Sequence, residues 1–258
     1  MAFNLASITS ESRLRAPRML VLGVEKIGKS SFAAESDRPI FMPIKGEEGI
    51  DALAVPQFPV CNTVQDVRMA LYSLATEAHD FGTAVIDSAS AFEPLVWSEV
   101  CTQNKAESIE DVKGGYGKGY VETLPIWRDI TERLDYLRNE KNMSSIIIGH
   151  VKVKRFDDPA GPSYDQYQFD INDKAANLLY RWADVILFCN TKVVVKAEKV
   201  GFNKEKHQGI DISGGSRFMY TQKRPAHPGG GRGAFGQLPY ELPLSYSAFT
   251  AAVASASQ

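Results

Sequence analysis

The sequence predicts an α/β fold with a mostly parallel central sheet flanked by helices and a β-hairpin extension on the C-terminal side. Apolar strand-like runs alternate with helical patterns along most of the chain, which is typical of parallel strands joined by helices. After residue 191 the sequence becomes rich in β-branched and basic residues. We expect a single domain over residues 1–258, with a core at about 17–190, a hairpin and basic loop at about 191–245, and a flexible, fraying tail at 251–258.

The individual elements follow from short local patterns. Strands are predicted at residues 19–22, 39–44, 83–87, 145–150 and 184–188, each a short apolar run. Helices are predicted at residues 31–35, 64–78 with Thr63 as cap, 125–139 and 172–182. Residues 191–200 and 216–221 predict the antiparallel hairpin, and the three glycines at 229–231 predict a flexible loop.

Composition describes an ordinary globular chain. With 258 residues, 44% hydrophobic and 23% charged, the chain can bury a substantial core. The formal net charge of −2 excludes a strongly basic protein, so any surface for nucleic acid must come from local clusters. The three cysteines lack metal-site spacing, and no apolar stretch is long enough to span a membrane. These features favour a reduced, cytoplasmic compartment.

One segment predicts the ligand. Between the first strand and the first helix, the pattern G-x-x-x-x-G-K-[ST] is matched without a gap by Gly23, Val24, Glu25, Lys26, Ile27, Gly28, Lys29 and Ser30. In that setting backbone N–H groups wrap around phosphate oxygens. Lys29, an exposed cation in the empty site, would reach the β- and γ-phosphates. Ser30 would hold Mg²⁺, and Ser31 would bond the α-phosphate. A chance glycine-rich turn is the alternative, but we expect a site for ATP and Mg²⁺.

Asp87 is the second candidate ligand of the metal. It ends the apolar run at residues 83–86 and is followed by Ser88. A carboxylate at the C-terminal end of a strand beside the phosphate loop can hold a water of the Mg²⁺ shell. An aspartate that merely ends a strand in a turn is the alternative, and the phosphate loop makes the metal role the favoured one.

Several blocks of sequence carry a family resemblance. The blocks GVEKIGKSS, PIKGEEG, AVIDS, IIIGHVKVKRFDDP and WADVILF occur in this order. Together they resemble the RecA-like ATPases of tailed phages, a group that includes the Sak-type single-strand annealing proteins. The resemblance covers nearly the whole chain. It implies a RecA-like P-loop NTPase core that binds ATP, Mg²⁺ and single-stranded DNA, and acts in phage recombination or single-strand annealing in the host cytoplasm. Lys26 stands where relatives often have glycine.

The resemblance also implies roles for polar residues that follow predicted strands. Glu47 and Glu48 follow the second strand, where a glutamate polarises the water that attacks the γ-phosphate. We favour Glu47, because the order G-E-E-G resembles T-E-D-G in relatives, and Glu48 is the alternative. His150 ends the fourth strand, at the position of a γ-phosphate sensor. Solvated loop acids and an ordinary core histidine are the alternative readings of these three residues.

Two segments combine cations with tyrosines, a composition suited to single-stranded DNA. In the first, at 105–120, the predicted contacts are Lys113, Tyr116, Lys118 and Tyr120. In the second, after the fourth strand, they are Lys152, Lys154, Arg155 and Tyr164. RecA-like proteins place DNA-binding loops in corresponding positions. Mobile, solvated loops are the alternative.

The resemblance further implies self-association. RecA-like sites generally lie between subunits, and a basic group of the neighbour completes each site. Candidates for such a finger, acting in trans on the γ-phosphate, are Arg217, Lys223, Arg224 and Arg232. The implied partners are single-stranded DNA, further copies of the chain in a ring or filament, and a phage or host single-strand-binding protein, without a membrane.

Other functions fit the same core. A nucleotide-gated protein remodeller or helicase loader would use ATP to act on a protein. A small-molecule kinase is disfavoured, since the sequence has no basic lid helix. A non-hydrolysing ATP-binding module would result if neither Glu47 nor Glu48 reached the γ-phosphate. Stimulation of ATP turnover by single-stranded DNA would separate the recombination function from these alternatives.

Overall fold

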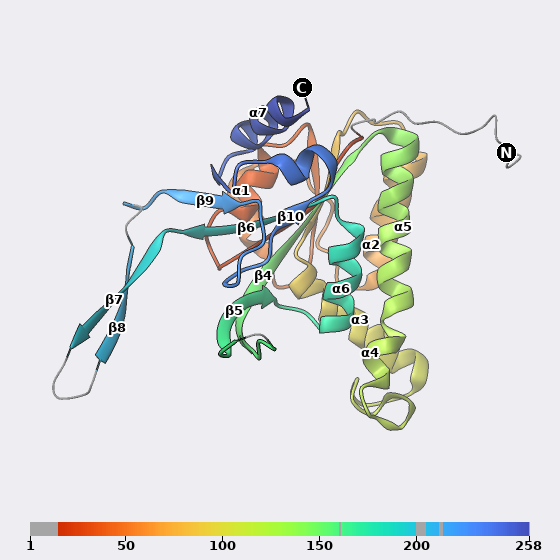
Figure 1. The fold of residues 1–258 in the computed structure, drawn as a ribbon. Helices are drawn as coiled ribbons and strands as arrows, with labels where there is room; N and C mark the ends of the chain where they lie inside the picture. The colour runs from red at the N-terminus through yellow and green to blue at the C-terminus, as the bar shows by residue number, and fades with distance from the viewer. Residues whose placement is uncertain (1–14, 160, 200–204, 212–213, 258) are drawn as a thin grey trace, which may run out of the picture.

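The computed structural model describes residues 15–159, 161–199, 205–211 and 214–257. Within these residues nine strands form one sheet, and helices cover both of its faces (Figure 1). The sheet contains β1 (Arg18–Gly23), β2 (Pro39–Pro43), β3 (Thr83–Asp87), β4 (Ser144–Phe156), β5 (Tyr164–Phe169), β6 (Val185–Thr191), β9 (Arg217–Tyr220), β10 (Gly230–Gly231) and β11 (Glu241–Pro243). A separate ribbon consists of β7 (Val193–Lys199) and β8 (Glu205–Asp211).

The helices lie mainly between the strands in chain order. The α-helices are α1 (Lys29–Ala34), α2 (Val64–Thr76), α3 (Ala89–Asn104), α4 (Lys118–Glu122), α5 (Leu124–Lys141), α6 (Asp173–Trp182) and α7 (Tyr246–Ala256). Short 3₁₀ helices are η2 (Glu48–Leu53), η3 (Val112–Gly114) and η4 (Gly233–Gln237). Thr63 and Asp66 exchange hydrogen bonds in a capping box, which confirms the predicted cap of α2.

The order of the parallel strands determines where the site lies. The sheet order is β11-β9-β6-β1-β4-β3-β2, and the neighbours from β6 to β2 are parallel. The core strands predicted from the sequence are all present, and the α/β fold is confirmed. β4 lies between β1 and β3, and its register places His150 opposite Gly23. Since the carboxyl ends of parallel strands share one edge, the residues that end β1 and β3 and His150 of β4 meet there.

Helices cover both faces of the sheet, and successive side chains of each strand point alternately to the two faces. Each strand therefore contributes to two buried cores. Leu20 and Leu22 belong to the core that α2, α3, α5 and α6 cover. Met19 and Val21 belong to the core beneath α1, η4 and α7. Among the described residues, no helix combines the length and the apolar character needed to cross a membrane.

The second predicted DNA segment is a strand pair, and not the loop expected from the sequence. β4 continues beyond the sheet to Phe156 and pairs antiparallel with β5, so that Lys154 lies opposite Gln166. Alternating residues such as Val151 and Val153 favour this extended conformation. The side chains predicted to contact DNA are therefore carried by a hydrogen-bonded hairpin.

The C-terminal hairpin also differs from the expectation in its pairing. β7 pairs with β8, whereas β9 pairs antiparallel with β6. In Figure 1 the β7–β8 ribbon extends away from the body of the molecule. β9 supplies partners for backbone groups at the edge of β6 that would otherwise be unpaired. The chain therefore returns to the main sheet after the ribbon.

Two expectations for the C-terminal part are wrong. Residues 229–231 are not a flexible loop, because β10 pairs with β6 and a Cβ on Gly231 would lie 2.4 Å from the Phe235 backbone. Glycine is required there for close packing. The tail expected to fray at 251–258 is helical as far as Ala256, where α7 ends. Phe249 and Val253, one helical turn apart, are buried on the sheet and hold α7 in place.

Candidate nucleotide-binding site

The phosphate-loop segment lies between a strand and a helix, as the sequence predicts. β1 ends at Gly23, and α1 begins at Lys29. Gly28 has a φ of +108°, a conformation that other residues rarely adopt. The Phe32 amide donates a hydrogen bond of 3.0 Å to the Gly28 carbonyl oxygen and starts the helix. The turn into α1 therefore depends on glycine at position 28.

Lys29 is buried, contrary to the expectation of an exposed cation. Its side chain folds back onto the loop, where Nζ donates to the carbonyl oxygens of Gly23 at 3.1 Å and Val24 at 2.8 Å. Burial lowers the pKa of the ammonium group, although carboxylates nearby act in the opposite direction. An ammonium group has three protons to donate. One proton therefore remains for a phosphate oxygen in this conformation.

Ser30, in the first turn of α1, contacts Asp87 at the end of β3, although β3 is not a neighbour of the strand that leads into α1. Ser30 Oγ donates to Asp87 Oδ2 at 2.7 Å, across the end of β4. Asp87 is only 5% exposed, and burial raises the pKa of its carboxyl group. A hydroxyl and a carboxylate suit Mg²⁺, because this ion prefers oxygen ligands and binds through few protein groups while it keeps several waters. A divalent cation would also offset the cost of the buried carboxylate charge, so the two residues fit the predicted metal.

Glu47 is held by two hydrogen bonds at the edge of the same site. Its Oε1 accepts from His150 Nε2 at 2.6 Å and from Ser88 Oγ at 3.0 Å. An ionised carboxylate can only accept, so Nε2 carries a proton. The hydrogen bond from His150 is the largest cause that lowers the pKa of Glu47, against an opposing effect of burial. The side chain of Glu48 lies outside the described residues.

These residues line one open cavity of about 550 Å³. Its lining includes the predicted residues Glu25, Lys26, Gly28, Lys29, Ser30, Ser31, Glu47, Asp87 and His150. Ile27 instead packs into the core beneath the loop, 5% exposed. The volume is within the range of small-molecule sites. Residues far apart in the sequence thus form a cavity that combines an ammonium group, a hydroxyl hydrogen-bonded to a carboxylate, and a second carboxylate held by His150.

Arg217 lines this cavity within its own chain. We expected it to act on the nucleotide of a neighbouring subunit. A Cβ on Gly28 would lie 2.9 Å from Arg217 Nη1, so the guanidinium group lies against the phosphate loop. The pairing of β9 with β6, and of β6 with β1, brings it there. Arg217 therefore lies beside the phosphate loop of its own chain, and its action in trans stays a prediction.

Comparison with protein families identifies the domain. The family described as an AAA domain matches residues 15–233. The chain belongs to this AAA-domain family. The site described above is accordingly that of a nucleotide-binding P-loop ATPase domain. No curated protein matches the chain. Among solved structures, the crystal structure of the RadB recombinase matches at 14% sequence identity with a TM-score of 0.44, covering 83% of this chain and 85% of that chain.

The other three candidates for a finger lie outside the nucleotide cavity of their own chain. The guanidinium of Arg224 stacks over the Tyr240 ring at 4.4 Å from the centroid. Arg232 donates a hydrogen bond to the Arg181 carbonyl oxygen. Lys223 lines a second cavity. Within the described residues, none of the three lines the nucleotide cavity.

The first predicted DNA segment of the AAA domain is ordered by internal contacts. Lys113 Nζ forms an ion pair with Glu122 at 2.7 Å, and Lys118 Nζ donates to the Lys113 carbonyl oxygen at 3.3 Å. Tyr120 donates its hydroxyl proton to Glu110 at 2.5 Å. Tyr116 differs from these residues, because it is 98% exposed. It alone of the predicted tyrosines presents a whole ring to solvent.

The second segment, the β4–β5 hairpin, also has paired cations. Lys152 lies 3.0 Å from Asp170, and Lys154 lies 3.0 Å from Asp173. Arg155 is more exposed, and its Nε lies 4.0 Å from the carboxylate of Asp157. The Tyr164 ring packs against Phe156, with centroids 5.3 Å apart. These contacts reduce the positive charge that the hairpin presents.

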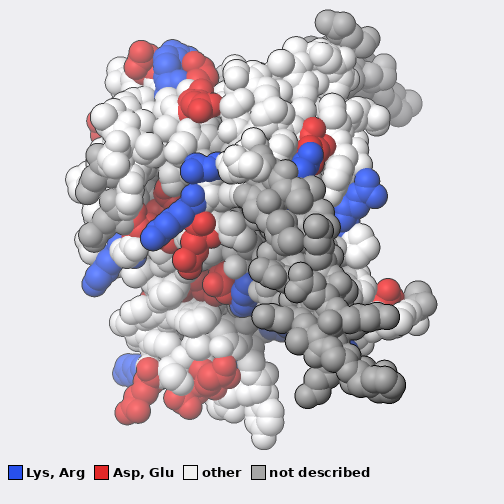
Figure 2. All heavy atoms as spheres, turned by 90° about the vertical axis from the view of Figure 1, so that its left-hand side faces the viewer, with Lys and Arg blue, Asp and Glu red and all other residues white. Residues whose placement is uncertain are grey.

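Surface charge is mixed in the same way over the face drawn in Figure 2. Lysine and arginine side chains lie interspersed with aspartate and glutamate side chains on this face. The formal net charge of −2 agrees with that distribution. A nucleic-acid surface on this face would therefore depend on particular contacts more than on a broad basic field.

Sequence reasoning missed one polar group of the site. Ser88 donates to Glu47, and the only sequence signal for it is its place directly after Asp87. Its Oγ also accepts from the Ala91 amide and so caps α3. One hydroxyl thus connects the start of a helix to the carboxylate in the nucleotide cavity.

Proposed function

We propose that this AAA domain hydrolyses ATP and that Glu47 positions and deprotonates the attacking water. One observation carries the proposal. A carboxylate fixed by His150 and Ser88 lines the same cavity as Lys29 and Ser30. A base held there can act on a water next to a bound γ-phosphate, and positioning of both reactants supplies a large part of such catalysis.

The chemistry assigns a role to each side chain of the cavity. The water oxygen attacks the γ-phosphorus, Glu47 accepts the water proton, and the bond to the bridging oxygen breaks to release ADP and phosphate. Lys29 would donate a hydrogen bond from its third ammonium proton to a phosphate oxygen. Ser30 and Asp87 would hold Mg²⁺, which when bound supplies positive charge to the phosphate oxygens.

His150 is proposed to sense the γ-phosphate through Glu47. Its Nε2 proton bonds the Glu47 carboxylate at 2.6 Å, and both side chains line the nucleotide cavity. A γ-phosphate within reach would compete for that proton. Transfer of the hydrogen bond to the phosphate would free Glu47 and raise its pKa, which makes it a stronger base.

Arg217 is proposed to contact the phosphates in cis. Its guanidinium group lies against the phosphate loop of the same chain, and a planar guanidinium suits phosphate oxygens. A finger acting in trans would then come from Lys223, Arg224 or Arg232 in a ring or filament of the chain. A protein that stays monomeric with ATP and DNA in analytical ultracentrifugation would exclude that arrangement.

We further propose that the domain binds single-stranded DNA and acts in phage recombination or annealing in the host cytoplasm, with a phage or host single-strand-binding protein as partner. Tyr116 supports this role, because a 98% exposed ring on a glycine-rich loop is free to stack on a base. The resemblance of the sequence blocks to phage RecA-like ATPases also supports it.

A nucleotide-gated protein remodeller or helicase loader is the second candidate. One observation favours it. Lys113, Lys152 and Lys154 are each paired with a carboxylate, which leaves less charge for a phosphate backbone. In this case the exposed Tyr116 would insert into a protein partner.

The deciding experiment measures ATP turnover with and without single-stranded DNA. We expect Mg²⁺-dependent turnover that DNA stimulates, and its loss in Lys29→Ala. Hydrolysis that is unchanged in a folded Lys29→Ala variant would refute the assignment of the site. Turnover that DNA does not change would favour the remodeller.

A further inference from the structure

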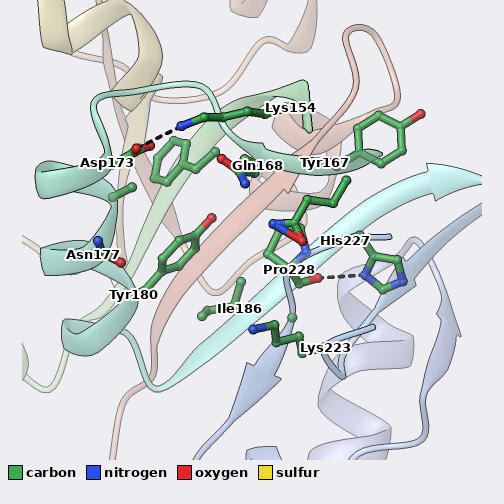
Figure 3. A pocket seen from close by; sticks show the side chains of 14 residues that line it. Lys154, Tyr167, Gln168, Asp173, Asn177, Tyr180, Ile186, Lys223, His227 and Pro228 are labelled. Atoms are coloured by element: carbon green, nitrogen blue, oxygen red, sulfur yellow. Dashed lines mark hydrogen bonds and ion pairs between the residues drawn. The ribbon is translucent and has the colours of Figure 1, made fainter. Parts of the chain in front are cut away.

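A second cavity of about 470 Å³ lies at the foot of the β4–β5 hairpin, between α6 and residues 223–229 (Figure 3). The lining residues described for it and for the nucleotide cavity do not overlap. Its polar side chains therefore have no part in the ATP chemistry. Their type and arrangement indicate a different ligand.

One wall of this cavity is a single face of α6. Asp173, Asn177 and Tyr180 are spaced by four and three residues, which places them on one side of a helix. Figure 3 shows them on the α6 side of the cavity, across from Pro228. Burial raises the pKa of Tyr180 to about 12, so its hydroxyl keeps its proton. This wall thus presents an aromatic ring, an amide and a carboxylate that is paired with Lys154.

The hairpin provides the second wall. Lys154 lies opposite Gln166 in the antiparallel register, and Gln168 follows two residues later. Opposite residues and residues two apart share a face of a strand pair. Two further amides and an ammonium group therefore face the cavity, all of them among its lining residues.

The third wall, residues 223–229, is fixed by aromatic packing. The His227 ring stacks on Phe188 with centroids 4.7 Å apart, and its Nδ1 lies 2.8 Å from the Pro228 carbonyl oxygen. Since a carbonyl only accepts, Nδ1 carries the proton, and Nε2 accepts from the Tyr240 hydroxyl at 3.1 Å. The Tyr167 amide also donates to the Ala226 carbonyl oxygen at 2.8 Å. The wall is therefore formed before a ligand binds.

We propose that this cavity binds one unstacked nucleobase that carries a phosphate. Ile186 and Phe169 form an apolar floor of the cavity, on which the flat ring of a nucleobase can lie. Amides such as those of Asn177, Gln166 and Gln168 are the groups that read base edges. Lys223 is exposed, lines the cavity and forms no ion pair with another described residue, so it is available to a phosphate.

A strand of single-stranded DNA is the source of this base, which rests on the proposed DNA-binding function. A base from a strand would enter beside Lys154, on the hairpin that the sequence assigns to DNA. A free mononucleotide has the same chemistry, and the experiment separates the two sources.

The test compares a short single-stranded oligonucleotide with an abasic strand of the same length, by fluorescence anisotropy on the full chain. The wild-type chain should bind the base-containing strand more tightly. Asn177→Leu and Gln168→Leu should each weaken that binding by roughly tenfold, which lies in the lower half of the range for an amide that reads a base edge, and leave the abasic strand unaffected. Gln65→Leu, an exposed amide on α2, is the matched control. Lys223→Ala should reduce the salt slope for both strands by about 0.7.

The outcomes separate this proposal from the one on which it rests. Equal binding of both strands by the wild-type chain and by Asn177→Leu would overturn the base cavity and leave DNA binding intact. A second measurement uses thymidine monophosphate with ADP saturating the nucleotide site. If the wild-type chain binds it and Asn177→Leu does not, the cavity is supported with a free nucleotide as its ligand, even if no oligonucleotide binds. Binding of neither ligand would overturn both proposals. Unfolding midpoints near that of the wild type show that the variants are folded.

Discussion

Removal of the imidazole at position 150 should shift the acid limb of the pH–rate profile of ATP hydrolysis to higher pH. Glu47 can act as a base only when it is ionised, so the rate falls below its pKa. The hydrogen bond from His150 is the main cause that holds this pKa below its ordinary value. In His150→Ala the carboxylate keeps the bond from Ser88 but loses the stronger one, and its pKa must rise.

The size of this shift follows from the geometry. A hydrogen bond to a charged group contributes about 1.5–3 kcal/mol, which at 1.36 kcal/mol per pKa unit corresponds to roughly one to two units. The Glu47 side chain is 28% exposed, so water replaces part of the lost interaction. We therefore expect a shift of about one pH unit.

The assay is kcat/KM for ATP from about pH 4 to pH 8, since this ratio reports the ionisation of the free enzyme. His150→Gln retains an N–H donor and should shift the limb less than His150→Ala. Profiles that are parallel, with a lower rate at every pH and no displacement of the limb, would refute the coupling of His150 to Glu47. Unfolding curves at each pH would separate this effect from loss of structure.

The neighbouring glutamates give a matched comparison: Glu47→Gln should slow turnover by about a hundredfold or more with ATP affinity retained, and the opposite pattern in Glu48→Gln would reassign the base. Arg217→Ala should weaken ATP binding more than ADP binding in calorimetric titrations, and equal losses would separate Arg217 from the γ-phosphate. Burial raises the pKa of Glu93 from 4.5 to about 7, so between these pH values the folded chain retains a proton that the unfolded chain releases. The free energy of unfolding should therefore fall by on the order of 3 kcal/mol between pH 4.5 and 7. Urea titrations of Glu93→Gln should lack this decline. Single-stranded DNA should bind with different affinity in the presence of ADP and of a non-hydrolysable ATP analogue, and equal affinities would refute a link between the two cavities.

Local patterns were sufficient to predict the parts of the site that are continuous in sequence. The phosphate loop combines a fixed glycine spacing with a strand before it and a helix after it, and Asp87 ends a buried strand. Both predictions depend on a few adjacent residues. The contact between Ser30 and Asp87 then follows from the parallel sheet, whose strands end at one edge.

Contacts that depend on strand pairing could not be predicted in this way. Arg217 reaches the phosphate loop only because β9 pairs with β6, whereas the sequence suggested a hairpin with residues 191–200. Lys29 is buried because two loop carbonyl oxygens attract its ammonium group, which no residue pattern encodes. The sequence pattern does not predict α3, because Pro94 interrupts the helical signal, although Phe92, Val96 and Val100 form an apolar stripe.

The two cavities are connected through one strand, which gives the expected coupling a physical path. His150 lines the nucleotide cavity, and Lys154, four residues later on β4, lines the second cavity. The carbonyl oxygen of His150 accepts from the Asp170 amide at 2.9 Å, directly after β5 ends. A γ-phosphate that draws the imidazole away from Glu47 would therefore act on the residue at which the hairpin leaves the sheet. Because the hairpin carries Gln166 and Gln168, a small rotation there changes where two of the three amides face the base.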